Sequence, residues 1–379
     1  MRSETLVGLS LVLALGACAD SATAPAAAGG AAPLLAAASG GIEGEYIVVL
    51  KEGASPTATA AVAGVHPHHV YTEALNGFSA TLNRGQLAAL RHHPGVAYVE
   101  QDQVVRADQT VPWNLDRIDQ PFLPLNGQYG FATGASTVHA YIIDTGIFAS
   151  HPEFTGRALN VFDVFGGTGN DCNGHGTGVA GIVGSVSYGV AKQVKLRGVR
   201  VLNCSGSGTN SGVIAGVDWV RVNHVYPAVA NLSLGGGSSS ALNTAVTNLY
   251  LGNVFVTVSA GNNGGNACNF APAGALGATT VGSTNAADQA APFTNGGPCL
   301  DIWAPGVNIT TVGLGKGPVT LTGSSLSSPH VAGVGAMVFA TFGGSSASVR
   351  NWVLSTATPG VVVNVPPNTA NRLLYKSTL

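Results

Sequence analysis

A serine followed by a long run of small and apolar residues constrains this chain more than any other feature. The segment GSSLSSPHVAG (323–333) places Ser325 just ahead of residues 331–340, whose small and apolar side chains predict a buried helix. Pro329 is expected in the first turn of that helix, where a missing N–H costs little. Ser325 should therefore lie at a helix N-terminus, where backbone N–H groups and the helix dipole stabilise negative charge. A serine that attacks a carbonyl group needs that setting.

Two other segments contain the partners that such a serine requires. Residues 138–144 form an apolar run that predicts a strand, and this run ends in Asp144. The segment NGHGTGVAG (173–181) places His175 at the start of a second helix of small residues. Taken singly, each motif is more often a structural turn or loop. Together and in this order, they favour a nucleophile, a base and an orienting acid.

Composition and missing motifs exclude other classes of protein. No G-x-S-x-G nucleophile elbow and no H-E-x-x-H zinc motif occurs in the chain. Charged residues make up only 9% and glycines number 53, which suits a tightly packed α/β core of small residues. The net charge of −2 provides no basic surface for nucleic acid. The chain is therefore expected to bind no nucleic acid.

The three motifs, in the order Asp144, His175 and Ser325, resemble the subtilase family, most closely its proteinase K-like secreted branch. This order is the one known for subtilisin. The resemblance covers most of the chain, from about residue 46 to residue 375. It implies a monomeric serine endopeptidase that acts on proteins and peptides, with Ser325 as nucleophile, His175 as base and Asp144 as the residue that orients the imidazole.

The resemblance also assigns residues that contact the substrate. The segment SAGNN (259–263) implies that the Asn262 side chain, with the Ser325 N–H, stabilises the developing oxyanion. The residues expected to line the first specificity pocket are small and include no carboxylate. They favour an apolar or aromatic side chain of the substrate there, with broad tolerance. The residues implied to pair with the substrate backbone or to line this pocket are Ser207, Gly208, Ser233, Leu234, Gly235, Ser259, Ala260 and Gly261.

Five cysteines leave one over if the others pair. The odd one is Cys18, and the remaining four permit three connectivities between which the sequence alone does not choose. The resemblance implies Cys172–Cys204 and Cys268–Cys299. Each bridge would close a loop of about thirty residues and contribute on the order of 3–4 kcal/mol in the chain-entropy model.

Structural calcium is a further implication of the resemblance. Asp301 matches a carboxylate ligand, with backbone oxygens near Leu276 and Ala278. Asp116 and Asp119 match a second site. Hard oxygen ligands suit Ca²⁺, although each of these aspartates alone is more often a solvated turn residue.

The N-terminus predicts export. Residues 1–18 read as a signal peptide, because the apolar stretch 6–17 is too short to span a bilayer as a helix. This stretch ends in LGAC, which resembles a bacterial lipobox whose cysteine, Cys18, is lipidated after cleavage. The alternative is an ordinary signal peptide that is cut nearby, with Cys18 incidental. The protein is thus expected outside the cell, and its precursor would be held to the membrane only through lipid on Cys18.

Residues 19–43 are rich in Ala, Gly, Ser and Pro and predict a disordered tether. Residues 44–108 predict a small α+β unit that resembles the inhibitory propeptide of subtilases, which assists folding and then occupies the active site with its C-terminal tail. The cut that releases it should fall between Val105 and Thr110. The expected elements of this unit are strands at 45–50, 75–82 and 96–100 and a helix at 86–92.

Residues 109–379 alternate strand and helix patterns and form the expected catalytic domain. The expected strands are 138–144, 199–202, 229–234 and 254–259, and the expected helices are 211–222 and 241–251. Continuous apolar strands are typical of parallel strands buried on both faces. The predicted fold is therefore α/β, a doubly wound and mostly parallel sheet with helices on both faces and catalytic groups at strand carboxyl ends and helix starts.

Two alternatives to a general endopeptidase stay open at this point. One is a catalytically inactive, subtilase-like binding or scaffold protein. The other is an enzyme restricted to removing its own propeptide.

Overall fold

The computed structural model describes residues 30–37, 41–103, 111–315 and 317–379. The chain divides into two compact units, Met1–Asp108 and Gln109–Leu379. The expected signal peptide, the candidate lipidation residue Cys18 and the whole of the expected cut region, 105–110, lie outside the described residues. Within the described residues, no single helix is long and apolar enough to cross a membrane, and α7 (Ser324–Phe342) with α8 (Ser346–Thr356) passes that test only as a bent pair.

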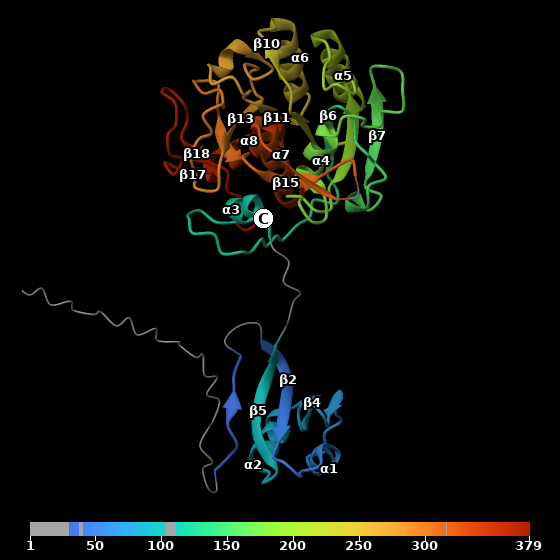
Figure 1. The fold of residues 1–379 in the computed structure, drawn as a ribbon, viewed down its shortest axis with the longest axis vertical. Helices are drawn as coiled ribbons and strands as arrows, with labels where there is room; N and C mark the ends of the chain where they lie inside the picture. The colour runs from blue at the N-terminus through green and yellow to red at the C-terminus, as the bar shows by residue number, and fades with distance from the viewer. Residues whose placement is uncertain (1–29, 38–40, 104–110, 316) are drawn as a thin grey trace, which may run out of the picture. The chain divides into compact units, whose positions relative to one another are not determined.

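In its described residues, the first unit is a five-stranded sheet with two short helices (Figure 1). Its strands, in the order in which they pair, are β1 (Leu34–Leu35), β5 (Val96–Gln103), β2 (Gly41–Leu50), β4 (Gly77–Thr81) and β3 (His69–Tyr71), and its helices are α1 (Pro56–Val62) and α2 (Arg84–His92). Val48, Phe78, Leu90 and Val99 are fully buried and form the centre of its core. An Asn83–Gln86 capping box starts α2 at Arg84, two residues ahead of the expected start at residue 86.

The prediction of a disordered tether extending to residue 43 is wrong for its described part. Leu34 and Leu35 pair in parallel with Val99 and Glu100 of β5, and β2 begins already at Gly41. Two leucines among alanines and glycines carry little strand signal, so composition concealed this edge strand. The pairing partner that orders them lies more than sixty positions further along the chain.

The second unit contains a nine-stranded sheet. Its strands, in the order in which they pair, are β17 (Thr358–Pro359), β18 (Arg372–Leu373), β14 (Ile302–Pro305), β13 (Thr279–Thr284), β11 (Phe255–Ser259), β9 (Ala228–Leu232), β6 (His139–Asp144), β8 (Lys195–Arg200) and β7 (Ala158–Asp163). All neighbouring strands pair in parallel except β17 and β18. The first strand along the chain, β6, lies between β8 and β9. The strand order therefore reverses at β6, and ligands of such sheets bind at the carboxyl ends of the strands near this point.

Helices cover both faces of this sheet (Figure 1). On one face α4 (His175–Gly184), α7 and α8 pack on one set of alternating strand residues, and α5 (Asn210–Asn223) and α6 (Ser240–Leu251) pack on the other set. The predicted α/β class with a doubly wound, mostly parallel sheet is confirmed.

The remaining elements of the second unit are short. They are α3 (Trp113–Asp119), the 3₁₀ turns Pro152–Phe154 and Ala267–Asn269, and the two-stranded pairs β10 (Gly236–Gly237) with β12 (Phe270–Ala271) and β15 (Ile309–Val312) with β16 (Pro318–Leu321). Among the expected strands, the one placed at 199–202 starts four residues earlier, as β8. Its first half contains Lys195 and Arg197, whose partly exposed charged side chains concealed the strand pattern.

Candidate active site

Asp144 and His175 meet at the carboxyl edge of the sheet. Asp144 is the last residue of β6 and is fully buried, while His175 is the first residue of α4. The Nδ1 atom of His175 lies 2.7 Å from Oδ1 of Asp144. The same carboxylate oxygen accepts the backbone N–H of Thr145 at 2.7 Å. The carboxylate therefore holds the imidazole with Nδ1 as the donor and leaves Nε2 free for another partner.

The charge of Asp144 raises the pKa of His175 above its ordinary value of 6.5, against the opposing effect of burial. Asp171 adds a smaller contribution in the same direction. A raised pKa means that the imidazolium form is stabilised, which is useful to a base that carries a proton only transiently.

Sequence reasoning missed Asp171, which organises the start of α4. Its Oδ1 accepts the N–H groups of Asn173 and Gly174, and its Oδ2 accepts both the N–H and the hydroxyl of Thr177. Four donors on one carboxylate fix the turn that carries His175. Asp171 lies three residues ahead of Gly174, the N-cap residue of α4. Its bond to the N–H of Asn173, two residues on, forms an Asx turn, and the tendency of aspartate to form such turns is the local signal that could have found it.

Ser325 is the second residue of α7, so the expected position at a helix N-terminus is correct. The prediction that Pro329 lies in the first turn is wrong, because α7 begins at Ser324 and Pro329 is its sixth residue. A proline there removes the N–H that would bond to the carbonyl four residues earlier, which is that of Ser325. The hydroxyl of Ser233 donates to this carbonyl instead, at 2.6 Å. Because of the proline, the Ser325 carbonyl accepts a hydrogen bond from Ser233, which follows the last residue of β9, in place of a bond within the helix.

The Ser325 hydroxyl itself donates to the carbonyl oxygen of Ser233 at 3.2 Å. In this rotamer it makes no hydrogen bond to His175. Rotation about χ1 moves a serine oxygen among three staggered positions, and contacts between catalytic groups are often loose until a substrate binds. Ser325 and His175 nevertheless line the same cleft.

Asn262 lies beside the serine and has a fixed orientation. Its Oδ1 accepts the backbone N–H of Ser324 at 2.9 Å. The Ser324 hydroxyl in turn accepts the N–H of Gly261 at 3.1 Å. Because the carbonyl side of the amide is engaged, its NH₂ group is the end available to the cleft that Asn262 lines.

One cleft of about 850 Å³ collects nearly all of the predicted site. His175, Ser325 and Asn262 line it together with every residue predicted to bind the substrate, whereas Asp144 lies behind His175 in the protein interior. No Asp or Glu occurs among the described residues that line the cleft. The predicted substrate-binding residues that line it are Ser207, Gly208, Ser233, Leu234, Gly235, Ser259, Ala260 and Gly261.

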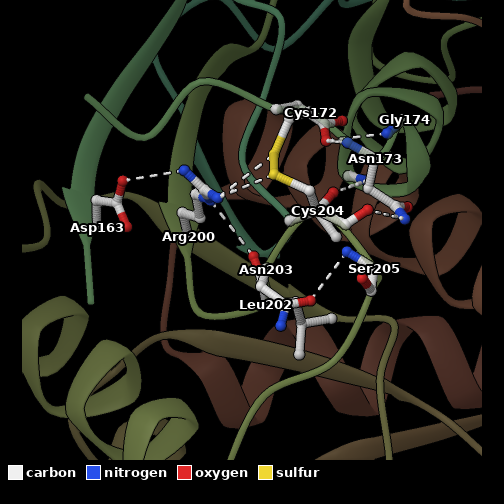
Figure 2. Close-up of a disulfide and its surroundings, with 12 residues drawn as sticks. Asp163, Cys172, Asn173, Gly174, Arg200, Leu202, Asn203, Cys204 and Ser205 are labelled. Carbon is white, nitrogen blue, oxygen red and sulfur yellow. Dashed lines mark hydrogen bonds and ion pairs between the residues drawn. A yellow bond between two sulfur atoms is a disulfide. The ribbon is translucent and has the colours of Figure 1, made fainter. Parts of the chain in front are cut away.

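A disulfide bond, Cys172–Cys204, joins the loop that leads to His175 with the loop that leads to the cleft edge at Ser207 (Figure 2). Asn173 strengthens this connection, since its Nδ2 donates to the carbonyl of Cys204 at 3.1 Å. The second predicted bridge, Cys268–Cys299, also forms. Both pairings implied by the resemblance are therefore present.

The aspartates expected to bind calcium do not fit that role in this structure. Asp301 accepts the Arg350 guanidinium on one oxygen and the Thr280 N–H on the other. Asp119 is paired with the ammonium of Lys376. A positively charged side chain on a carboxylate repels a second cation there.

Two further observations describe the surroundings of these aspartates. Within the described residues, no group of three or more His, Cys, Asp or Glu side chains is placed to hold a metal ion. Leu276, whose backbone oxygen was expected to contribute, lies on an exposed turn, whereas Ala278 is buried.

Comparisons with known proteins identify the family to which this fold belongs. Residues 137–373 match the model of the Subtilase family, and residues 45–108 match that of the peptidase inhibitor I9 family. The chain is 45% identical to an extracellular serine proteinase of Thermus sp. (strain Rt41A), over 98% of this chain and 97% of the relative. It is 39% identical to Proteinase R of Parengyodontium album, over 91% and 92%.

A solved structure, described as a cold adapted subtilisin-like serine proteinase, superimposes with a TM-score of 0.69 at 44% identity. The match covers 71% of this chain and 99% of that one. The chain therefore belongs to the subtilase family, as a serine endopeptidase that carries an inhibitor I9 propeptide.

Proposed function

We propose that this protein is secreted and hydrolyses peptide bonds with a triad of Asp144, His175 and Ser325 through an acyl-enzyme. The observation that carries the proposal is the bond of 2.7 Å between the buried Asp144 and His175, at the rim of the cleft that also contains Ser325. In the first step His175 Nε2 takes the hydroxyl proton as Ser325 Oγ attacks the carbonyl carbon of the substrate. His175 then donates this proton to the leaving amine, and water releases the acyl group by the same steps.

Negative charge on the substrate oxygen during each attack needs hydrogen-bond donors. The NH₂ group of Asn262 and the backbone N–H of Ser325 are the two that we assign. The N–H of Ser325 is suitable because the first N–H groups of an α-helix have no partner within the helix. Ser324 holds the Asn262 amide through its backbone N–H. Donors that are oriented before the reaction cost no reorganisation during it.

The substrate is proposed to bind as an added strand against two backbone edges, one at Ser207–Gly208 and one at Ser233–Gly235. Backbone pairing provides affinity with little demand on sequence. Ser259, Ala260 and Gly261 offer small walls to the side chain before the scissile bond, and a lining without carboxylates does not select a basic side chain. We therefore propose broad specificity with a preference for an apolar or aromatic residue at this position.

The chain is proposed to mature by removing its own propeptide. Under this proposal residues 1–18 direct export, residues 44–108 assist folding and inhibit the enzyme, and cleavage between 105 and 110 releases the catalytic domain 109–379 as a monomer. The match of residues 45–108 to an inhibitor family supports the inhibitory role. Relatives named as extracellular proteinases support the location.

Casein hydrolysis by the purified chain, with the size of the precursor followed on the same samples, tests the proposal. Hydrolysis of casein together with shortening of the precursor supports the general protease. Shortening without casein hydrolysis would favour an enzyme restricted to itself. Neither reaction would favour an inactive binding protein.

Replacing Asn262 with alanine is expected to lower kcat about 10²–10³-fold with little change in KM, because the lost donor acts mainly on the charged transition state. The measurement is steady-state hydrolysis of a small peptide substrate. Asn263→Ala, one position further along the same cleft wall, is the matched control and should retain most activity. A KM that rises while kcat stays constant would assign Asn262 to substrate binding instead.

Lipid on Cys18 is the proposal for the precursor. Palmitate labelling is expected to mark the precursor and to disappear in Cys18→Ser. Because cleavage before Thr110 detaches residue 18, the active form should be soluble and unlabelled. Labelling of the mature chain, or labelling of the precursor that survives Cys18→Ser, would contradict this.

A further inference from the structure

Lys376 is a lysine in the interior of the catalytic unit, with a side chain only 2% exposed. Its backbone N–H donates to the carbonyl of Ile118 at 2.9 Å, which fixes it against the end of α3. A buried ammonium is stable only when it is paired with a carboxylate and hydrogen-bonded. Its surroundings must therefore provide for a full positive charge.

All three N–H donors of the Lys376 ammonium have oxygen partners. It lies 2.8 Å from Asp119 Oδ1 and donates to the main-chain oxygens of Ser377 at 3.1 Å and Leu379 at 3.3 Å. The ring centroid of Tyr129 lies 5.4 Å away, within the range of a cation–π interaction. An ammonium has no further donor to offer, so this cage of oxygens and a π face is complete.

The other acceptors expected to face calcium also have protein donors. Asp119 Oδ2 accepts the N–H of Gly130 at 2.8 Å. The two oxygens of Asp116 accept the N–H groups of Asn126 and Gly127. Calcium needs six to eight oxygen ligands, and here each oxygen of the two carboxylates already has one protein donor.

Asp301 is also paired with a cationic side chain of the protein. Its Oδ1 lies 2.7 Å from Nη2 of Arg350, which α8 supplies, and its Oδ2 accepts the Thr280 N–H at 2.9 Å. Lys376 and Arg350 come from the last forty residues, whereas their carboxylate partners come from earlier parts of the unit. Each cation thus ties the C-terminal region to a segment that a metal ion would otherwise brace.

We propose that Lys376 and Arg350 are built-in substitutes for calcium. The segments that contain Asp119 and Asp301 are then held in place without the metal. This departs from the calcium sites that the family resemblance implies. It is independent of the proposed catalytic mechanism, because neither pair contacts the cleft.

The test is thermal unfolding of the full chain carrying Ser325→Ala, which prevents self-digestion from distorting the transition. Tm is measured in calcium chloride and in EDTA, and we expect the same value in both. A specific site filled at about 100 times its Kd would instead raise Tm by about 5–10 °C. Lys376→Met, which keeps the side-chain stem, is expected to lower Tm by about 5–15 °C because it leaves Asp119 without its partner.

Calcium should restore part of the Tm lost in Lys376→Met, since the metal no longer competes with an ammonium. Lys192→Met is the matched control. Lys192 also donates to two main-chain oxygens and lies 5.8 Å from the Tyr129 ring, but no carboxylate pairs with it among the described residues. Its variant should gain no response to calcium.

Two results would overturn the proposal. One is a Lys376→Met chain with an unchanged Tm. The other is a fall in Tm of the parent chain in EDTA that disappears when Asp119→Asn and Asp301→Asn are introduced together. A fall in Tm that persists in this double variant would place the calcium site away from Asp119 and Asp301. It would support Lys376 and Arg350 as the partners of these two carboxylates.

Discussion

Ser325→Ala is expected to leave an uncut precursor with no measurable protease activity. Loss of the nucleophile of a serine–histidine–aspartate triad costs about 10⁴–10⁶-fold in kcat, because the remaining members act only through it. Propeptide removal should stop as well, since we propose that the same serine performs it. Casein hydrolysis and the mass of the purified chain measure the two effects.

A matched serine variant separates chemistry from folding. Ser355 is exposed on α8 and remote from the cleft, so Ser355→Ala makes the same change without touching the site. It should be cut and active like the parent chain. Adding a trace of active enzyme to Ser325→Ala should release its propeptide, which would show that the variant is folded. A product of mature size from Ser325→Ala alone would contradict the assignment.

Asp144→Asn is expected to lower kcat about 10⁴-fold while the fold persists, because an amide favours the wrong imidazole tautomer. The hydrogen bond of 2.7 Å to His175 is the contact that this change alters. Asp218→Asn, on an exposed position of α5, is the matched control and should be near normal. Both are measured as kcat and KM on the same peptide substrate.

The pH profile gives a second measurement of the same contact. The charge of Asp144 raises the pKa of His175 above 6.5. His175 must be neutral to accept the serine proton, so kcat/KM should fall as pH drops through a value above 6.5. In Asp144→Asn the stabilising charge is gone, and the acid limb of the residual activity should move to lower pH. An acid limb at the same pH in both proteins would show that another group controls it.

The agreement between the predicted and the observed elements differs from one element to the next. Strands with mostly apolar runs, such as 138–144 and 254–259, were predicted to within a residue or two, because a parallel strand buried on both faces contains few exposed polar positions that would blur the pattern. The strand with alternating charges, β8, was placed too late. The edge strand β1 was missed, since its two leucines pair with β5, which lies more than sixty positions further along the chain.

The residues of the candidate site also differ in how well the sequence predicted them. Asp144, His175 and Ser325 were visible because strand ends and helix starts leave local signals in the sequence. Asp171, which accepts four hydrogen bonds at the start of α4, was missed although its sequence favours an Asx turn. The contact of Ser233 with the Ser325 carbonyl had no signal at all, because it joins residues 92 positions apart.

The sequence by itself determined the fold class, the three motifs and their order, because these follow from hydrophobic patterns and from residue types within short segments. Only the tertiary structure decided which charges meet. Asp119 with Lys376 and Asp301 with Arg350 are pairs separated by about 50 to 260 positions, and sequence spacing says nothing about such contacts. A carboxylate looks the same in sequence whether its partner is a metal ion or a lysine, and only folding brings the partner to it.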